Sequence, residues 1–295
     1  MTKVSVIPLT SDRHDDWLRV YNKGRDNLSG FVPIHPQELG VMIRNQQCTQ
    51  EDMYLALQGR RPTAVARFLQ DAASRMSFIA DLVSVPDTSA GIEALVGFFM
   101  DLARENGSTS LTSWTFMAQV STPDTLSKFT FDTRRVRHEM SADLALAKVT
   151  GPPRKPRARE CNRKDSSLKI SFYDTAPSIR PLELFELRDE VSLDWQPRFA
   201  VFREKSGGKL MVASRSKHKR KEGRIDLTDL ATKFAKQNEL LSELIQDLAF
   251  SLYHDGVRRV KLEIDAGIEL KQALMDFGFE VRRTLLEMCL EIMQD

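Results

Sequence analysis

The sequence predicts a mixed α/β protein of the α+β class, built from two copies of one fold. Each copy is expected to be a twisted, mostly antiparallel sheet flanked by helices. The first observation behind this is a repeated signature, Phe-x-Phe-Asp/Glu-x-Arg-Arg-x-x-x-Glu-Met, which begins at residue 129 and again at residue 277 of the 295-residue chain. A repeat at this spacing is about the size of one ordinary domain and too long for a solenoid. The second observation is that the same order of predicted strands and helices can be followed twice.

The first copy begins with a strand and two helices. Apolar alternation over residues 4–9 predicts the strand, and Ser11 is a suitable N-cap for a helix that extends to about residue 27. Pro36 suits the first turn of a second helix over residues 36–45. Three strand-like runs follow, and the turn residues between them favour a meander; they cover residues 53–58, 63–69 and 76–85.

The rest of the first copy contains a long helix with apolar residues at helical spacing over residues 91–105. Asn106 and Gly107 form a typical helix stop. The pattern then predicts a strand over residues 111–114, a short helix over 123–129 and a final strand over 131–145.

The second copy repeats this order after residues 151–165, whose prolines and like charges predict a basic linker. We therefore expect an N-terminal domain over residues 1–150 and a C-terminal domain over 166–295. The second domain lacks a counterpart of the helix at 36–45. Its expected strands are 168–173, 198–203, 209–214, 224–230, 257–264 and 279–293, and its expected helices are 181–191, 238–253 and 268–277.

The composition excludes several classes of protein. Hydrophobic residues make up 41% of the chain and charged residues 28%, which is typical of a globular protein with its own core. Cys48, Cys161 and Cys289 are isolated, so neither a disulfide framework nor a zinc site is predicted, and a reducing, cytoplasmic location is expected. The five histidines lack metal-ligand spacing, so no metal is expected. No apolar run approaches the ~18 residues of a membrane helix, so no membrane partner is expected.

The element order and three local motifs resemble the GNAT (Gcn5-related) N-acetyltransferase fold. The run from Met275 to Arg283, Met-Asp-Phe-Gly-Phe-Glu-Val-Arg-Arg, is similar to the ending typical of the family, and Phe129–Arg135 is its less regular counterpart. The run from Val83 to Val96 resembles the passage from the fourth strand into the following helix. The resemblance covers nearly the whole chain, once in each half, and tandem members of this superfamily are known.

The resemblance implies acetyl-CoA as the cofactor. In the family, the passage after the fourth strand binds the pyrophosphate, because backbone amides at a helix N-terminus and the helix dipole attract anions. In the first copy the matching residues are Val83, Val85, Ser89, Ala90, Gly91 and Ile92. The corresponding run in the second copy, residues 232–240, contains no glycine, and Phe234 and Glu239 would obstruct or repel an anion. The first copy is therefore the expected cofactor site.

The resemblance also implies acetyl transfer from acetyl-CoA to an amine on a small molecule or a protein. Asp81, on the predicted fourth strand, is the one carboxylate placed to serve as a base in the first copy, and Asp226 sits comparably in the second. Both can equally be strand-end acids that face solvent. The tyrosine that often protonates the leaving thiolate in the family is replaced by Leu126 in one copy and Leu274 in the other.

A second interpretation is a catalytically inactive tandem that binds RNA or a ribonucleoprotein. A predicted hairpin tip carries a cluster of cations, and the linker adds more. Phosphate backbones attract such loops through counterion release, although a solvated charge run explains each cluster equally well. Neither segment contains stacking aromatic residues, so no sequence-specific readout is expected. The candidate nucleic-acid residues at the hairpin are Arg215, Lys217, Lys219, Arg220 and Lys221.

The arginine pairs in the repeated signature allow two interpretations. Arg134 and Arg135, and likewise Arg282 and Arg283, can form ion pairs with carboxylates on neighbouring strands, such as Glu139 and Glu287. They can alternatively form a patch that binds an anionic ligand.

Overall fold

A computed structural model of the chain describes residues 3–85, 89–147, 158–161, 181–202, 209–227, 238–265 and 270–293. These residues form two compact units. Unit 1 comprises Met1–Val136, Pro181–Asp189 and Arg283–Asp295, and unit 2 comprises Arg137–Arg180 and Glu190–Arg282. The predicted domain boundaries at residues 150 and 166 remain a prediction, and the compact units divide the chain differently.

Unit 1 contains a sheet in the order β1-β2-β3-β4-β5-β12. The neighbours are antiparallel except for β4 and β5, which are parallel. The elements are β1 (Val4–Pro8), η1 (Ser11–Arg13), α1 (His14–Arg25), α2 (Pro36–Arg44), β2 (Met53–Gln58), β3 (Arg61–Asp71), β4 (Met76–Ser84), α3 (Ala90–Glu105), β5 (Ser110–Phe116), α4 (Ser121–Lys128) and the start of α5 (Leu184–Leu193).

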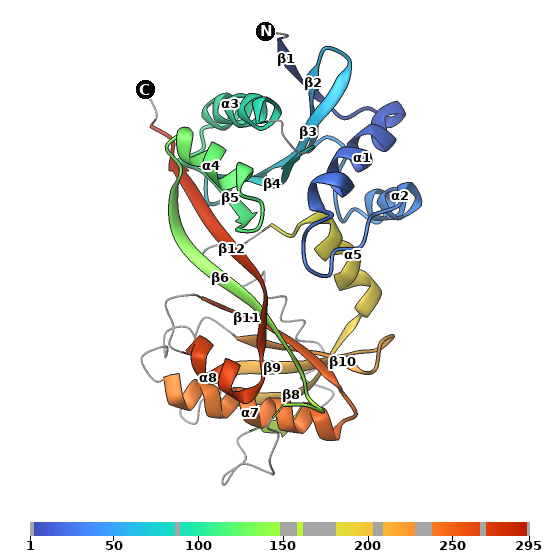
Figure 1. The fold of residues 1–295 in the computed structure, drawn as a ribbon, viewed down its shortest axis with the longest axis vertical. Helices are drawn as coiled ribbons and strands as arrows, with labels where there is room; N and C mark the ends of the chain where they lie inside the picture. Colours follow the sequence, from blue (N-terminus) through green and yellow to red (C-terminus); the bar gives the residue numbers. More distant parts are fainter. Residues whose placement is uncertain are drawn as a thin grey trace. The chain divides into compact units, whose positions relative to one another are not determined.

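Helices cover both faces of the unit 1 sheet, with α3 on one face and α1 on the other (Figure 1). Successive side chains of a strand point to opposite faces, so one strand can serve both cores. Leu55 and Val65 pack in the cluster that contains Trp17 of α1. Ala56 and Ala64, one residue along each strand, pack in the cluster that contains α3. Because both faces of the sheet are buried, the sequences of β2, β3 and β4 are nearly continuous apolar runs.

Two long strands each contribute to both units. In β12 (Glu280–Glu291), residues Leu285–Glu291 pair with β5 inside unit 1. In β6 (Asp132–Asp143), residues Arg137–Asp143 pair with β11 (Arg259–Asp265) inside unit 2. Each compact unit therefore includes a strand segment from the opposite half of the sequence.

Unit 2 has the strand order β6-β11-β10-β9-β8-β7, in which β10 and β11 are parallel and the other pairs antiparallel. Helix α7 supplies much of its core, including the fully buried Ile245, Leu248 and Leu252. The remaining elements are β7 (Ala158–Glu160), β8 (Trp195–Phe202), β9 (Lys209–Ser216), β10 (Glu222–Leu227), α7 (Asn238–His254) and α8 (Leu270–Phe277).

Most predicted elements of the second copy are confirmed, with one correction. Ala158–Glu160, within the predicted linker, form the edge strand β7, because the amide of Ala158 is held by Asp247 Oδ2 at 2.9 Å and the strand pairs with β8. The predicted strand at 168–173 lies outside the described residues. No helix among the described residues is long and apolar enough to cross a membrane.

Candidate functional site

The most unusual feature of unit 1 is a bulge in β4 at Asp81. Val65 pairs with Val83 and Arg67 pairs with Ala80, so a step of two residues on β3 is matched by three on β4. Asp81 has a φ of +56°, a left-handed conformation that aspartate tolerates better than most residues, and it is completely buried. The bulge therefore withdraws the Asp81 backbone from regular strand pairing.

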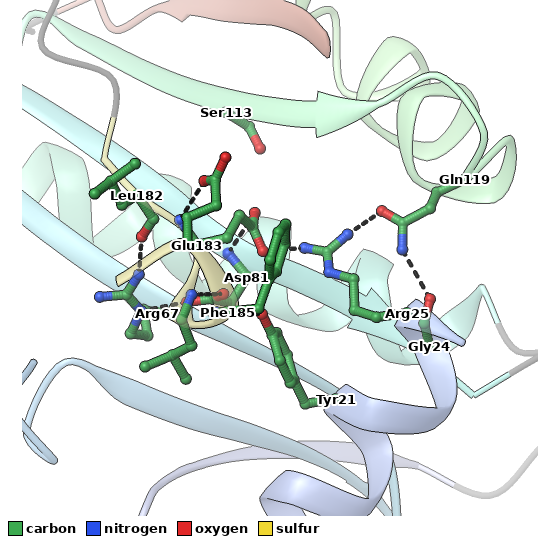
Figure 2. A network of polar contacts seen from close by, with 12 residues as sticks. Tyr21, Gly24, Arg25, Arg67, Asp81, Ser113, Gln119, Leu182, Glu183 and Phe185 are labelled. Atoms are coloured by element: carbon green, nitrogen blue, oxygen red, sulfur yellow. Dashed lines mark hydrogen bonds and ion pairs between the residues drawn. The ribbon is translucent and has the colours of Figure 1, made fainter. Parts of the chain in front are cut away.

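The Asp81 carboxyl is held on both sides by protein groups. It forms a buried ion pair with Arg67, and its Oδ1 accepts a hydrogen bond of 2.8 Å from the backbone N–H of Leu184. Arg67 also donates to the carbonyl of Leu182. The segment Pro181–Asp189, distant in sequence, is thus anchored next to the bulge (Figure 2).

Glu183 lies at the centre of the same network. Its Oε1 accepts a hydrogen bond of 3.1 Å from the backbone N–H of Asp81, and its Oε2 forms an ion pair with Arg25. Arg25 also donates to Gln119 Oε1, and Gln119 Nε2 donates to the carbonyl of Gly24 at 2.8 Å. Figure 2 shows these side chains converging from α1, β4, the residue before α5 and the loop after β5. The network is closed to bulk solvent, because its side chains are all buried: Arg25, Asp81, Gln119 and Glu183.

The two buried carboxyl groups differ in proton affinity. Burial raises the pKa of Glu183 well above its ordinary value, and the neighbouring Asp81 reinforces this shift against the opposing charge of Arg25. Burial also acts to raise the pKa of Asp81, but Arg67 and two hydrogen bonds outweigh it, so the pKa of Asp81 lies below its ordinary value. Asp81 consequently carries the negative charge, while Glu183 holds its proton to a higher pH.

These contacts do not suit Asp81 as a catalytic base. A base needs a pKa near the working pH and must be able to reach its substrate. Asp81 has a lowered pKa, and its two oxygens are occupied by Arg67 and the Leu184 amide. The predicted role as a base stays untested, and the structure gives this residue the role of an anchor.

The residues predicted to bind the cofactor lie where β4 leads into α3. Val83 is buried, and the N–H of Val85 donates to the carbonyl of Thr63 at 2.9 Å. Ile92 is buried in the core under α3. Residues 86–88, between strand and helix, lie outside the description.

Ser89, Ala90 and Gly91 occupy the beginning of α3. Ser89 and Ala90 are exposed, and no side chain of the described residues caps this helix end. Gly91 is buried for a different reason: a Cβ there would lie 2.7 Å from Thr63 Oγ1 and 2.8 Å from the Cβ of Ala64. The start of α3 is suited to receive an anion, because the first amides of a helix have no partners within it and the side chains of Ser89 and Ala90 are small.

The parallel strands β4 and β5 separate beside this helix end. Their pairing runs only to Ile79 and Ser113, although both strands continue. On β5 beyond that point, the buried Thr115 Oγ1 has no hydrogen-bond partner among the described residues, and the same holds for Arg25 Nε at the end of α1. In sheets with parallel strands, ligands bind in crevices at the carboxyl ends of strands that part. A cofactor arm with amide and carbonyl groups has the chemistry to satisfy such atoms.

The remaining predicted catalytic positions are structural. Asp226 is buried and pairs with Arg224 at 2.9 Å. Leu126 and Leu274, which stand where the family often has a tyrosine, are completely buried in the two cores. Of the passage at 232–240 in the second copy, residues 232–237 lie outside the described residues.

The candidate nucleic-acid residues lie at the β9–β10 hairpin, as predicted. Arg215 is ion-paired with Asp255 at 3.0 Å, and Lys217 with Asp194 at 2.8 Å. Lys219, Arg220 and Lys221 are exposed. Two of the five cations therefore already have protein counter-ions, and RNA binding stays a prediction.

The first arginine pair of the repeated signature forms ion pairs across strands. Arg134 contacts Glu291 at 2.6 Å and Arg135 contacts Glu287 at 3.5 Å, both inside unit 1. This confirms the structural interpretation for Glu287.

No protein-family model and no curated protein sequence matches the chain. Solved structures do. A GCN5-related N-acetyltransferase from Sphaerobacter thermophilus has a TM-score of 0.63 at 14% identity, over 98% of this chain and 96% of that one. A tandem GNAT protein from the clavulanic acid biosynthesis pathway has a TM-score of 0.61 at 13% identity, over 99% and 100%. A GCN5-related N-acetyltransferase from Anabaena variabilis has a TM-score of 0.60 at 9% identity, over 99% and 73%.

The fold is that of the tandem GCN5-related N-acetyltransferases. The resemblance found in the sequence is thereby confirmed at the level of fold. Within the GNAT fold, the network around Asp81 was only partly foreseen: Asp81 was singled out, whereas Arg25, Gln119 and Glu183 were missed. Charged and amide side chains in loops and at helix ends are ordinarily solvent-exposed, and only tertiary contacts bury these three.

Proposed function

We propose that this protein is an acyl-CoA-dependent N-acetyltransferase, which transfers an acetyl group from acetyl-CoA to an amine, and that its cofactor site lies in unit 1. The acceptor is an amine on a small molecule or a protein. The observation that carries the proposal is the start of α3 at the exposed Ser89 and Ala90, which follows the bulged strand β4 and which no side chain among the described residues caps. The tandem GNAT fold supports the acetyltransferase activity.

The residues of unit 1 fit the two ends of the cofactor differently. At the diphosphate end, the amides at the start of α3 and the helix dipole would hold the anion. Toward the sheet, Thr115 Oγ1 is a buried polar atom without a partner among the described residues, beside the separating strands. These groups would bind the cofactor and orient its arm along β4.

The chemistry would rely chiefly on positioning. The amine nitrogen attacks the thioester carbonyl, the C–S bond breaks, and the proton lost by the amine is balanced by the proton gained by the thiolate. Holding the two reactants together supplies much of the acceleration in such reactions. Asp81 is not assigned as the base here, because its charge is already paired with Arg67.

The proposal is tested with a charge placed at the start of α3. In Ala90→Glu, a carboxylate would stand at the amides that receive the diphosphate. A pair of unit charges ~5 Å apart in water interacts by about 0.8 kcal/mol, so a doubly charged diphosphate should lose about 1.6 kcal/mol, or more than tenfold in affinity. Isothermal titration calorimetry with acetyl-CoA measures this loss.

Gly97→Glu is the matched control. It adds the same charge to the same helix, about 10 Å further along the axis, at a position where a Cβ would meet nothing within 4 Å. Its affinity for acetyl-CoA should remain near that of the wild type. If the wild type takes up no acetyl-CoA, or if both variants bind it equally, the assignment of the site to unit 1 is wrong.

A further inference from the structure

The backbone amide of Asp81 is a hydrogen-bond donor that neither neighbouring strand uses in the regular ladder. The bulge removes Asp81 from the register with β3, and pairing with β5 has already ended at Ile79. The amide instead donates to Glu183 Oε1 at 3.1 Å. The donor and its acceptor are both buried.

This amide lies where the inner end of an acyl-CoA would be expected. An extended arm that ran from the start of α3 along β4 would pass Ser84 and reach Asp81 about 10 Å further on, since a strand rises ~3.3 Å per residue. A free amide at the parting of two parallel strands is suited to bind a carbonyl oxygen. In this structure a carboxyl oxygen of the protein itself holds that donor.

We propose that the segment Pro181–Asp189, here called the plug segment, occupies the acyl end of the acyl-CoA site of unit 1, with Glu183 bound to the amide that would otherwise receive the thioester carbonyl. Acyl-CoA binding would then require the plug segment to leave its place. This inference rests on the proposed function, and it adds an autoinhibitory contact to it.

Polar contacts hold the first half of the plug segment at four points besides the Asp81 amide. The N–H of Leu184 donates to Asp81 Oδ1, and that of Phe185 donates to Tyr21 Oη at 3.3 Å. Glu183 pairs with Arg25, and the carbonyl of Leu182 accepts from Arg67. Figure 2 shows that these contacts gather at one place, around the start of α5.

Apolar contacts anchor the same segment. Leu184 and Phe185 are buried in the cluster under α1, and the Phe185 ring lies 5.7 Å from that of Phe31 and 5.9 Å from that of Phe116. Arg188, further along, donates to the carbonyl of Val32 at 2.9 Å. With so many contacts the closed form dominates. When only a small fraction of molecules is open, the apparent dissociation constant of a ligand rises by the reciprocal of that fraction.

The test compares two ligands on two proteins. In Glu183→Ala the amide of Asp81 is released and the ion pair with Arg25 is lost. We expect this variant to bind acetyl-CoA at least about tenfold more tightly than the wild type, measured by calorimetry. 3′-Phospho-ADP, which has the diphosphate but no acyl arm, should bind equally to both proteins. Asp189→Ala, which removes a carboxyl group from a partly exposed ion pair in the same segment, should bind like the wild type.

A second measurement on the wild type does not depend on how the variant folds. Amide hydrogen exchange of Leu184 and Phe185 should become faster when acetyl-CoA is added, because both amides lose their acceptors if the plug segment leaves. 3′-Phospho-ADP should leave the exchange unchanged.

The outcomes separate this inference from the proposed function. If neither ligand binds any of the proteins, both the proposed function and the inference about the plug segment are wrong. If acetyl-CoA binds the wild type and Glu183→Ala equally, or if exchange of the plug amides slows or stays the same, the plug is refuted and the cofactor site stands. Weaker acetyl-CoA binding by Glu183→Ala, with 3′-phospho-ADP unaffected, would also refute the plug and would make Glu183 part of the ligand site.

Discussion

Replacing Arg67 by methionine should destabilise unit 1 strongly. The side chains of Arg67 and Asp81 are 3% and 0% exposed, so the substitution leaves a buried carboxylate without its counter-ion. Arg67 is the main group that holds the pKa of Asp81 below its ordinary value, and without it burial acts to raise that pKa. Removing one partner of a buried ion pair costs about 3–5 kcal/mol. Methionine keeps the apolar bulk of the arginine stem, so the loss reports mainly on charge.

A second substitution isolates the charge from the packing. Asparagine at position 81 tolerates the φ of +56° and keeps a carbonyl oxygen for the Leu184 amide, but it carries no charge. The double variant Arg67→Met, Asp81→Asn should therefore regain about 2 kcal/mol relative to Arg67→Met alone, since replacing both partners of a buried pair is often nearly neutral.

Urea unfolding followed by tryptophan fluorescence measures these changes. Trp17 and Trp114 both belong to the core of unit 1, and a Trp195→Phe background removes the third tryptophan of the chain. Arg104→Met is the matched control, because Arg104 and its partner Asp101 are 50% and 73% exposed and should contribute below about 1 kcal/mol. The reasoning is refuted if Arg67→Met costs no more than this control, or if the double variant is less stable than the single one.

The pH dependence, the thiols and the last strand each provide a further test. The pKa of Glu183 is raised above its ordinary 4.5, so its bound proton stabilises the fold below pH 4.5 and this contribution is lost as the pH rises. Above pH 4.5 the free energy of unfolding should therefore fall less steeply with pH in Glu183→Gln than in the wild type. Parallel pH profiles of the two proteins would contradict this. Burial raises the pKa of the Cys48 thiol to about 11, so at pH 8 only about one Cys48 thiol in a thousand is ionised. Iodoacetamide should therefore modify the half-buried Cys161 before Cys48. Equal rates of modification of the two cysteines would contradict this. A chain truncated after residue 282 lacks Leu285–Glu291, the strand segment that pairs with β5. It should no longer show the cooperative urea unfolding of unit 1. An unchanged unfolding midpoint would contradict this expectation.

The elements themselves were largely predictable from the sequence. The helix expected at residues 91–105 is found at Ala90–Glu105, and Gly107 at its end has the positive φ of +66° that favours glycine. Strong apolar periodicity and clear stop signals fix such elements locally. The mostly antiparallel character of the sheet was also predicted.

The partners of two segments could not be predicted. The periodicity of residues 181–191 and 279–293 shows that each has an apolar face, but not which core that face enters. Both were assigned to the second copy, and Pro181–Asp189 and Arg283–Asp295 belong to unit 1. The buried network follows from this placement, because Glu183 meets Arg25 and Asp81 only once its segment is seated there.

The glycine at the start of α3 shows why a matched motif can mislead about its cause. Gly91 was taken as a residue that lets a phosphate approach the backbone. The structure gives it a reason that needs no ligand, since any side chain at this position would collide with Thr63 and Ala64 on β3. A substitution of Gly91 would therefore disturb the packing of α3 whether or not a cofactor binds. Ser89 and Ala90 are exposed, so their small size is not explained by packing. A loss of acetyl-CoA affinity in Ala90→Glu thus speaks for a ligand, whereas the same loss in a Gly91 variant would not.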